Sequence, residues 1–195
     1  MQAFPKLGLQ YLTFLHIVFR SHLDLVVALP QAAFLRVLGA IKDGVDSLDP
    51  EVAQQAAGAL DHLASNYVRA AKRGGEVGSS SAAGSGSGGT SGAALQAHIA
   101  ASPNVFETLM KIVFQILVFG EAANQWALAR PLLPLVLAAE LVRPDCFEAF
   151  KSELVRGQPS ELQSRMSEEM IRLMRDVTRG LDVVNRDRFA QVRPA

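Results

Sequence analysis

Apolar residues recur every three or four positions along most of this 195-residue chain. Between Gln31 and Leu48 the apolar positions are Phe34, Val37, Leu38, Ile41, Val45 and Leu48. This spacing places one apolar stripe along an amphipathic helix. The same reasoning, with prolines and capping residues as boundaries, predicts further helices over residues 6–20, 22–29, 50–73, 93–101, 144–157 and 160–177. Ser21 and Asp49 are the expected N-caps of the helices that follow them.

The longest apolar run is Val105 to Phe119, and it carries Glu107, Lys111 and Gln115 at i, i+4 and i+8. These three residues form one narrow polar strip on a helix that is otherwise apolar, with Glu107 and Lys111 in the favourable order for an ion pair. A bilayer span needs about 20 predominantly apolar residues. We therefore expect a helix that is covered by protein on several sides and is not inserted into a membrane.

A second apolar segment, residues 126–140, contains Pro131 and Pro134. Each proline lacks a backbone donor and would kink a helix interior. Two interpretations remain open: the helix starts near Arg130 with Pro131 in its first turn, or it continues from further upstream and bends there.

Residues 74–92 differ sharply in composition, since fourteen of these nineteen residues are Gly or Ser. Such a segment cannot bury enough apolar surface to offset its ordering entropy, which predicts a flexible insertion in a helix-to-helix loop. Beyond Gly180, residues 180–195 are predicted to form a frayed C-terminal tail.

No sustained period-two alternation occurs in the sequence, and its Asp-Gly pair, Asp43-Gly44, is not flanked by alternating strands as a hairpin would require. The predicted fold class is all-α, and residues 1–195 form one region of antiparallel helix pairs stacked as HEAT-like repeats, an alpha solenoid. An irregular bundle is the alternative. If the chain is one end of a solenoid, residues 6–29 leave a second apolar surface uncovered, with Leu9, Tyr11, Val18, Leu25 and Val26 as candidates.

The charge balance and the single cysteine argue against some kinds of partner and covalent link in this chain. The chain has 19 Lys plus Arg and 19 Asp plus Glu, so no net field favours nucleic acid as a partner. The arginines between Arg165 and Arg193 alternate with carboxylates, which is typical of a solvated helix face rather than a phosphate-binding patch. The one cysteine, Cys146, cannot form an internal disulfide.

Candidate chemical motifs are weak. Gly84, Gly86 and Gly89 satisfy the spacing G-x-G-x-x-G, but no strand precedes them and the surrounding Gly/Ser composition makes such a match common. The four histidines, His16, His22, His62 and His98, are scattered and match no metal-ligand spacing. We therefore expect neither a metal nor a cofactor, and no enzyme activity.

Several stretches resemble one protein family in matching order. They are Asn124-Gln125-Trp126, Arg130-Pro131-Leu132-Leu133 with the aliphatic run to Glu140, Leu38 to Leu48, Ala59 to Leu63, Gln158-Pro159, and Asn185 to Phe189. Together they resemble the C-terminal region of nuclear export receptors of the exportin-seven type, also called Ran-binding protein sixteen. This branch of the importin-beta superfamily is related to exportin four.

The resemblance implies HEAT repeats and a receptor that carries protein cargo between nucleus and cytoplasm through the nuclear pore complex. It further implies binding of nucleoporins and, in the full-length receptor, of Ran-GTP. Candidate interface or structural anchors on the matching residues are Asn124, Gln125, Trp126, Arg130, Arg186 and Arg188. Such receptors are several times longer, so the chain is expected to be a fragment or a truncated relative. The alternative is a stand-alone helical scaffold or adaptor without a Ran-dependent cycle.

Trp126 is open to two interpretations. Tryptophans are enriched among the residues that dominate binding energy at interfaces. A tryptophan between two apolar helices also packs readily into a core, and Lys111 or Arg130 could lie over its ring.

Overall fold

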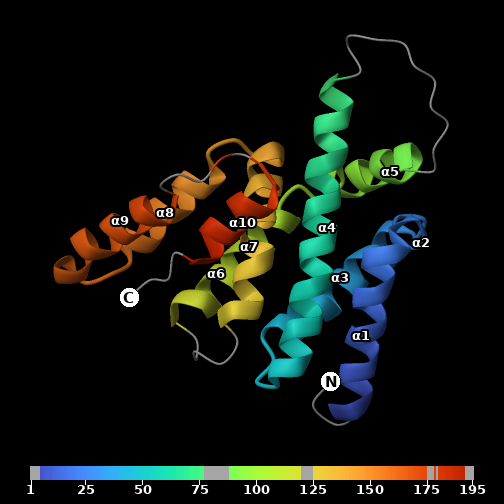
Figure 1. The fold of residues 1–195 in the computed structure, drawn as a ribbon, viewed down its shortest axis with the longest axis horizontal. Coiled ribbons are helices and arrows are strands. Elements are labelled where there is room, and N and C mark those ends of the chain that lie inside the picture. Colours follow the sequence, from blue (N-terminus) through green and yellow to red (C-terminus); the bar gives the residue numbers. More distant parts are fainter. Residues whose placement is uncertain (1–4, 77–87, 120–124, 175–177, 179, 192–195) are drawn as a thin grey trace.

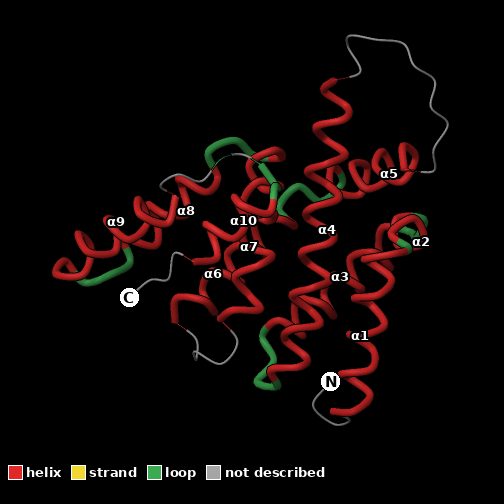
Figure 2. The backbone as a smooth tube through the Cα atoms, viewed as in Figure 1, coloured by secondary structure: helices red, strands yellow, loops and turns green. Residues whose placement is uncertain are grey.

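A computed structural model describes residues 5–76, 88–119, 125–174, 178 and 180–191 of the chain. Its helices are α1 (Pro5–Ser21), α2 (Leu23–Val27), α3 (Gln31–Val45), α4 (Pro50–Glu76), α5 (Gly88–Ala100), α6 (Val105–Phe119), α7 (Gln125–Val142), α8 (Cys146–Arg156), α9 (Ser160–Met174) and α10 (Val183–Gln191). Figure 2 shows helices and loops and no strand in this part of the chain. The prediction of an all-α fold is confirmed.

The helices are arranged around α4. Helix α4 lies between α1 and α7 and packs against both, so that these three helices form a row (Figure 1), while α10 packs against α7 and also reaches α4 through Arg186. Helix α3 packs onto α4, and α6 and α8 pack onto α7. Figure 1 shows α1 and α4 running in the same direction, with α3 returning the chain between them. This alternation is typical of stacked helical repeats.

Small residues allow α1 to lie close to α4 and α3. A Cβ atom added to Gly58 of α4 would lie 2.6 Å from Cε1 of His16, and one added to Gly44 of α3 would lie 2.5 Å from Cδ1 of Leu12. Helix α4 also carries the buried small residues Ala53, Ala56, Ala57, Ala59 and Ala64. The two glycines thus permit a close approach between these helices.

Helix α4 begins at its predicted cap. The Asp49 carboxylate accepts a hydrogen bond from the backbone N–H of Glu51 at 2.9 Å, and Pro50 occupies the first helical position. The carboxylate thereby satisfies one of the donors that a helix start leaves without a partner. The cap predicted for Ser21 is wrong, because α2 has His22 at its N-cap and no side-chain hydrogen bond there.

Helix α7 runs without a break through Pro131 and Pro134. The interpretation in which the helix starts near Arg130 is wrong. Each proline removes one intrahelical hydrogen bond, but Leu128, Leu132, Leu133 and Leu135 are all buried. Burial of such side chains contributes about 1.5–3 kcal/mol each, so packing between α4 and α6 outweighs the local cost.

Two predicted segments have different boundaries in the structure. Leu48 was placed on the apolar face of its helix, but α3 ends at Val45 and Leu48 is 96% exposed. The insertion predicted at residues 74–92 is shorter, because α4 continues to Glu76 and α5 already starts at Gly88. Residues 77–87, the middle of that insertion, lie outside the described residues.

The prediction of a frayed tail over residues 180–195 is wrong for its central part. Residues Val183–Gln191 form α10, which packs against α7 with Phe189 buried at 3% exposure. A short helix with a weak apolar stripe forms here because neighbouring helices supply its packing partners. None of the described helices has the length and apolar character needed to cross a bilayer.

Candidate interaction surfaces

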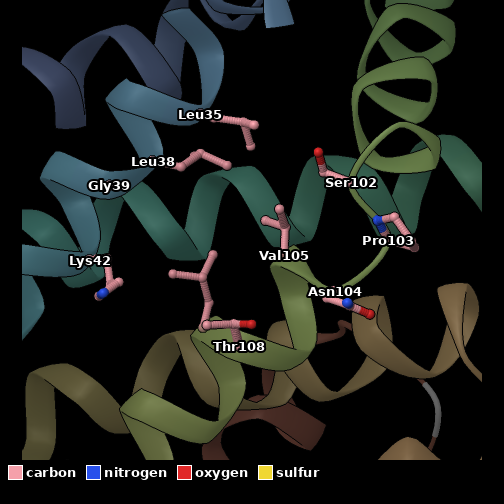
Figure 3. A pocket seen from close by; sticks show the side chains of 10 residues that line it. Leu35, Leu38, Gly39, Lys42, Ser102, Pro103, Asn104, Val105 and Thr108 are labelled. Carbon is pink, nitrogen blue, oxygen red and sulfur yellow. The ribbon is translucent and has the colours of Figure 1, made fainter. Parts of the chain in front are cut away.

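A groove of about 430 Å³ lies between α3 and the start of α6. Leu35, Leu38, Gly39 and Lys42 of α3 line one side, and Ser102, Pro103, Asn104, Val105, Thr108 and Leu109 line the other. Figure 3 shows the two sets of side chains facing a shared space, with α4 behind it. The groove is wide enough for one or a few side chains of a bound polypeptide.

The groove lies between α3, which packs on α4, and the start of α6, which packs on α7. Gly39 contributes no side chain, and no atom lies within 4 Å of the position that its Cβ would take. Leu38 and Leu109 are 4% exposed at the bottom, while Leu35 is 37% exposed at the edge. An apolar floor with a partly open wall is suited to apolar ligand side chains.

Lys42 is the charged residue of the groove lining, which has no carboxylate. It is exposed on α3. The lining therefore offers an apolar contact surface with one cationic group at its edge. Its lining has no nucleophile–base pair.

A polar network holds the α6 side of the groove. Glu107 pairs with Lys111 at 3.2 Å and with Arg143 at the end of α7. Arg143 also donates to the side chain of Asn104, which lines the groove, at 3.3 Å. Lys111 reaches Glu153 of α8 at 3.4 Å. The Glu107–Lys111 pair predicted from the sequence is thus part of a chain of contacts joining α6, α7 and α8.

Of the predicted anchor residues, the structure describes the side chains of Arg130 and Arg186. Arg130 is exposed on α7. Asn124 and the side chains of Gln125, Trp126 and Arg188 lie outside what the structure describes. An interface role for these residues stays a prediction.

Arg186 forms an ion pair with Asp61 of α4, joining α10 to the centre of the fold. Asp61 is 7% exposed. The ion pair thus joins α10 to α4, and an interface role for Arg186 stays a prediction.

Two histidines that are distant in sequence meet between α1 and α4. The ring centroids of His16 and His62 are 5.4 Å apart, and His16 Nδ1 is hydrogen-bonded to Gln55 Oε1 at 2.7 Å. Burial lowers the pKa of His62, with the nearby Asp61 carboxylate opposing this effect. Among the described residues no three His, Cys, Asp or Glu side chains form a group able to hold a metal ion. The pair is therefore interpreted as a packing contact.

Leu35, Gly39 and Thr108 of the groove are not among the residues singled out in the sequence. Leu35 lies off the main apolar face of its helix, and Gly39 lies in the middle of a helix. Both features were visible in the sequence, but the meeting of α3 with α6 depends on contacts across about 70 residues that no local pattern encodes.

The surface predicted to be uncovered at residues 6–29 is present, but on partly different residues. Tyr11 and Leu25 are 37% and 61% exposed. Leu9 and Val18 are half-buried against the core, and Val26 is buried. The prediction was wrong for these last three because α1 turns Leu9 and Val18 toward the core and α2 does the same with Val26.

The chain is similar to exportin-7 proteins. Over 189 residues it is 28% identical to exportin-7-B of Xenopus laevis and to Ran-binding protein 17 of Homo sapiens, covering 96% of this chain in each case. It is 23% identical over 210 residues to Ran-binding protein 16 of Drosophila melanogaster. These matches confirm the family resemblance drawn from the sequence.

The chain spans only a small part of these relatives, 16% of exportin-7-B and 17% of the Drosophila protein. No protein-family model matches the chain. No solved structure matches it.

Proposed function

We propose that this chain is part of a nuclear export receptor, which carries protein cargo between nucleus and cytoplasm in a cycle linked to Ran-GTP. The observation that supports the proposal is the similarity along 96% of the chain to proteins named exportin-7 and Ran-binding protein 17. A row of helices with an open groove, and no catalytic group in that groove, fits a protein whose work is binding. The receptor would shuttle through the nuclear pore complex and would have no enzyme activity.

The proposed mechanism is thermodynamic linkage. If cargo and Ran-GTP both bind the same conformation of the receptor, each raises the affinity for the other by the same factor. Hydrolysis of GTP in the cytoplasm removes one ligand, and the affinity for cargo falls. Stacked helical repeats suit this role because each repeat contacts only the repeats next to it. Small rotations between neighbouring repeats therefore add up to a large change in the curvature of the whole receptor.

The transport proposal is tested by recovering the chain from its own cells with an affinity tag. Extracts are supplied with a Ran variant that cannot hydrolyse GTP, or with Ran-GDP. We expect a set of cargo proteins that is retained with Ran-GTP and lost with Ran-GDP. An identical set in both nucleotide states would instead support the stand-alone scaffold or adaptor.

Within this proposal, the groove between α3 and α6 is the surface for phenylalanine-glycine segments of nucleoporins. Its apolar floor, Leu38 and Leu109, matches an aromatic side chain. Gly39→Leu should fill the groove without disturbing α3, because no atom lies within 4 Å of its Cβ position.

Binding of a fluorescent phenylalanine-glycine repeat peptide provides the measurement. We expect Gly39→Leu to weaken it by about tenfold, equivalent to about 1.4 kcal/mol. Gly74→Leu is the matched control, since the Cβ position of Gly74 also has no neighbour within 4 Å and the residue lies near the end of α4, away from the groove. Equal affinities of the two variants would rule out the groove as this site.

A further inference from the structure

The ammonium group of Lys42 has no counter-ion at the groove between α3 and α6. Lys42 is exposed, and no carboxylate lines this groove. Asp46 follows one turn later on α3, yet among the described residues no ion pair joins Lys42 to it or to any other carboxylate. The positive charge of the lining is therefore available to a bound partner.

The charge lies at one end of the groove and not over its middle. Figure 3 shows Lys42 at one end and the segment from Ser102 to Asn104 at the other, with the side chains of Leu38 and Val105 between them. A partner that lies along the groove therefore meets an apolar contact first and the cation next to it.

The opposite end of the groove offers hydrogen-bond donors. The Asn104 side-chain oxygen accepts a hydrogen bond from Arg143 at 3.3 Å, which leaves the Asn104 amide group to donate. The Ser102 hydroxyl oxygen accepts from the Gln31 amide at 2.9 Å, which leaves its own O–H to donate. A polypeptide backbone supplies carbonyl oxygens as acceptors for such donors.

The dimensions of the groove relate the apolar contact to the cation. Lys42 comes three residues after Gly39, which is about 4.5 Å along the axis of α3. Successive residues of an extended peptide are about 3.3 Å apart. A peptide whose aromatic side chain fills the space beside Gly39 therefore places a residue one or two positions away next to Lys42.

The open form of the groove favours a peptide segment over a small molecule. Leu35 at its edge is 37% exposed, and Lys42 is exposed as well. Small ligands are held by sites that bury most of their surface. An extended segment instead needs one seated side chain and a few contacts along its backbone.

We propose that the groove prefers phenylalanine-glycine segments that have an aspartate or glutamate within two residues of the phenylalanine, and that Lys42 determines this preference. The inference rests on the proposed function of the groove as the surface for such segments. It narrows the partner from any phenylalanine-glycine segment to an acidic one.

The test compares two fluorescent peptides on the whole 195-residue chain. Both contain one phenylalanine-glycine pair, flanked on each side by aspartate in the first peptide and by asparagine in the second. Flanks on both sides place one carboxylate near Lys42 in either direction of binding. We expect the aspartate peptide to bind about three- to fivefold more tightly at low salt, as for an exposed ion pair, with a difference that shrinks as salt is added.

Variants of α3 assign the preference to one residue. Lys42→Met keeps an unbranched side chain and removes the charge, so it should bind the two peptides equally. Arg36→Met is the matched control, because Arg36 is also exposed on α3 but does not line the groove. It removes the same charge from the same helix and should keep the preference for the aspartate peptide.

The outcomes separate this proposal from the function on which it rests. Equal affinities of the unmodified chain for the two peptides, both weakened by Gly39→Leu, would leave the groove as the binding surface and overturn the acidic preference. A preference that survives Lys42→Met would overturn the role of Lys42. Binding of both peptides that Gly39→Leu leaves unchanged would overturn the groove itself. A dimer of the chain, seen by light scattering, that Gly39→Leu dissociates would identify a second copy as the occupant and overturn the proposal.

Discussion

Arg186 of α10 donates a hydrogen bond to the carboxylate of Asp61 in α4, across 125 residues of sequence. Its neighbour Asn185 is buried and holds the segment that leads into α10. The Asn185 amide donates to the carbonyl oxygens of Thr178 and Gly180, each at 2.7 Å, and its oxygen accepts from Thr178 N–H at 2.8 Å. Two consecutive residues therefore fix the last described helix against the central one.

Removing one member of the Asp61–Arg186 pair should be costly. We expect Asp61→Ala to lower the free energy of unfolding by about 2–3 kcal/mol, because it leaves a partly buried guanidinium without its counter-ion. The double variant Asp61→Ala/Arg186→Ala should lose less than the sum of the two single losses. Urea denaturation provides the measurement, and strictly additive losses would contradict a direct interaction.

His98 joins three helices at one point. Its Nε2 donates to the carbonyl oxygen of Val27, the last residue of α2, at 2.9 Å. Its ring stacks on Phe34 of α3 with centroids 4.3 Å apart. Gln31 closes the contact, bonding to His98 Nδ1 and donating to the Ser102 hydroxyl at 2.9 Å.

Replacing His98 separates the stacking contribution from the hydrogen bonds. His98→Phe keeps a ring on Phe34 but leaves the Val27 carbonyl without its donor, and should cost about 1–2 kcal/mol. His98→Ala should cost about 1 kcal/mol more, because the ring contact is lost as well. Thermal unfolding measures both, and equal losses would show that the stack contributes nothing.

Replacing a mid-helix glycine by alanine should change the stability of the fold in opposite directions at two positions. At Gly58 the new methyl group would meet the His16 ring at 2.6 Å, so Gly58→Ala should destabilise the fold by about 1–3 kcal/mol. At Gly39 nothing lies within 4 Å, so Gly39→Ala should stabilise it by about 0.5–1 kcal/mol through helix propensity. Denaturation midpoints test the pair, and a gain at Gly58 would mean that His16 moves aside freely.

Apolar periodicity predicted the helices well, because most of them bury one face. It failed where contacts distant in sequence decide the outcome. The run through Pro131 and Pro134 stays helical because its leucines are buried between other helices. Residues 183–191 become helical because Phe189 and Arg186 find partners in the row.

The candidate interaction surfaces were harder to predict from the sequence than the helices. An uncovered face on the first helix could be anticipated, since a terminal repeat has a neighbour on one side only. Its residues were partly misassigned, because a shift of one position rotates a helix surface by about 100°. The groove beside Gly39 could not be foreseen, because it depends on how α3 and α6 are spaced on α4.

The last prediction concerns pH and His62. Burial lowers the pKa of His62 below its usual 6.5, and the charges of His16, Arg20 and Arg186 act in the same direction against the Asp61 carboxylate. As the pH falls below 6.5, His62 takes up a proton in the unfolded chain before it does so in the folded protein. The stabilising contribution of the neutral ring is therefore complete above that pH and is lost progressively below it, with a slope of at most about 1.4 kcal/mol per pH unit.

His62→Gln should remove this part of the pH dependence. Between about pH 7.5 and pH 5.5, above the range where most carboxylates titrate, the free energy of unfolding should fall less steeply in His62→Gln than in the unmodified chain. His22→Gln is the control, because His22 is exposed and should leave the slope unchanged. If the two variants gave the same slope as the unmodified chain, the contact between α1 and α4 would be insensitive to the charge of His62, and the pH response would have to come from other groups.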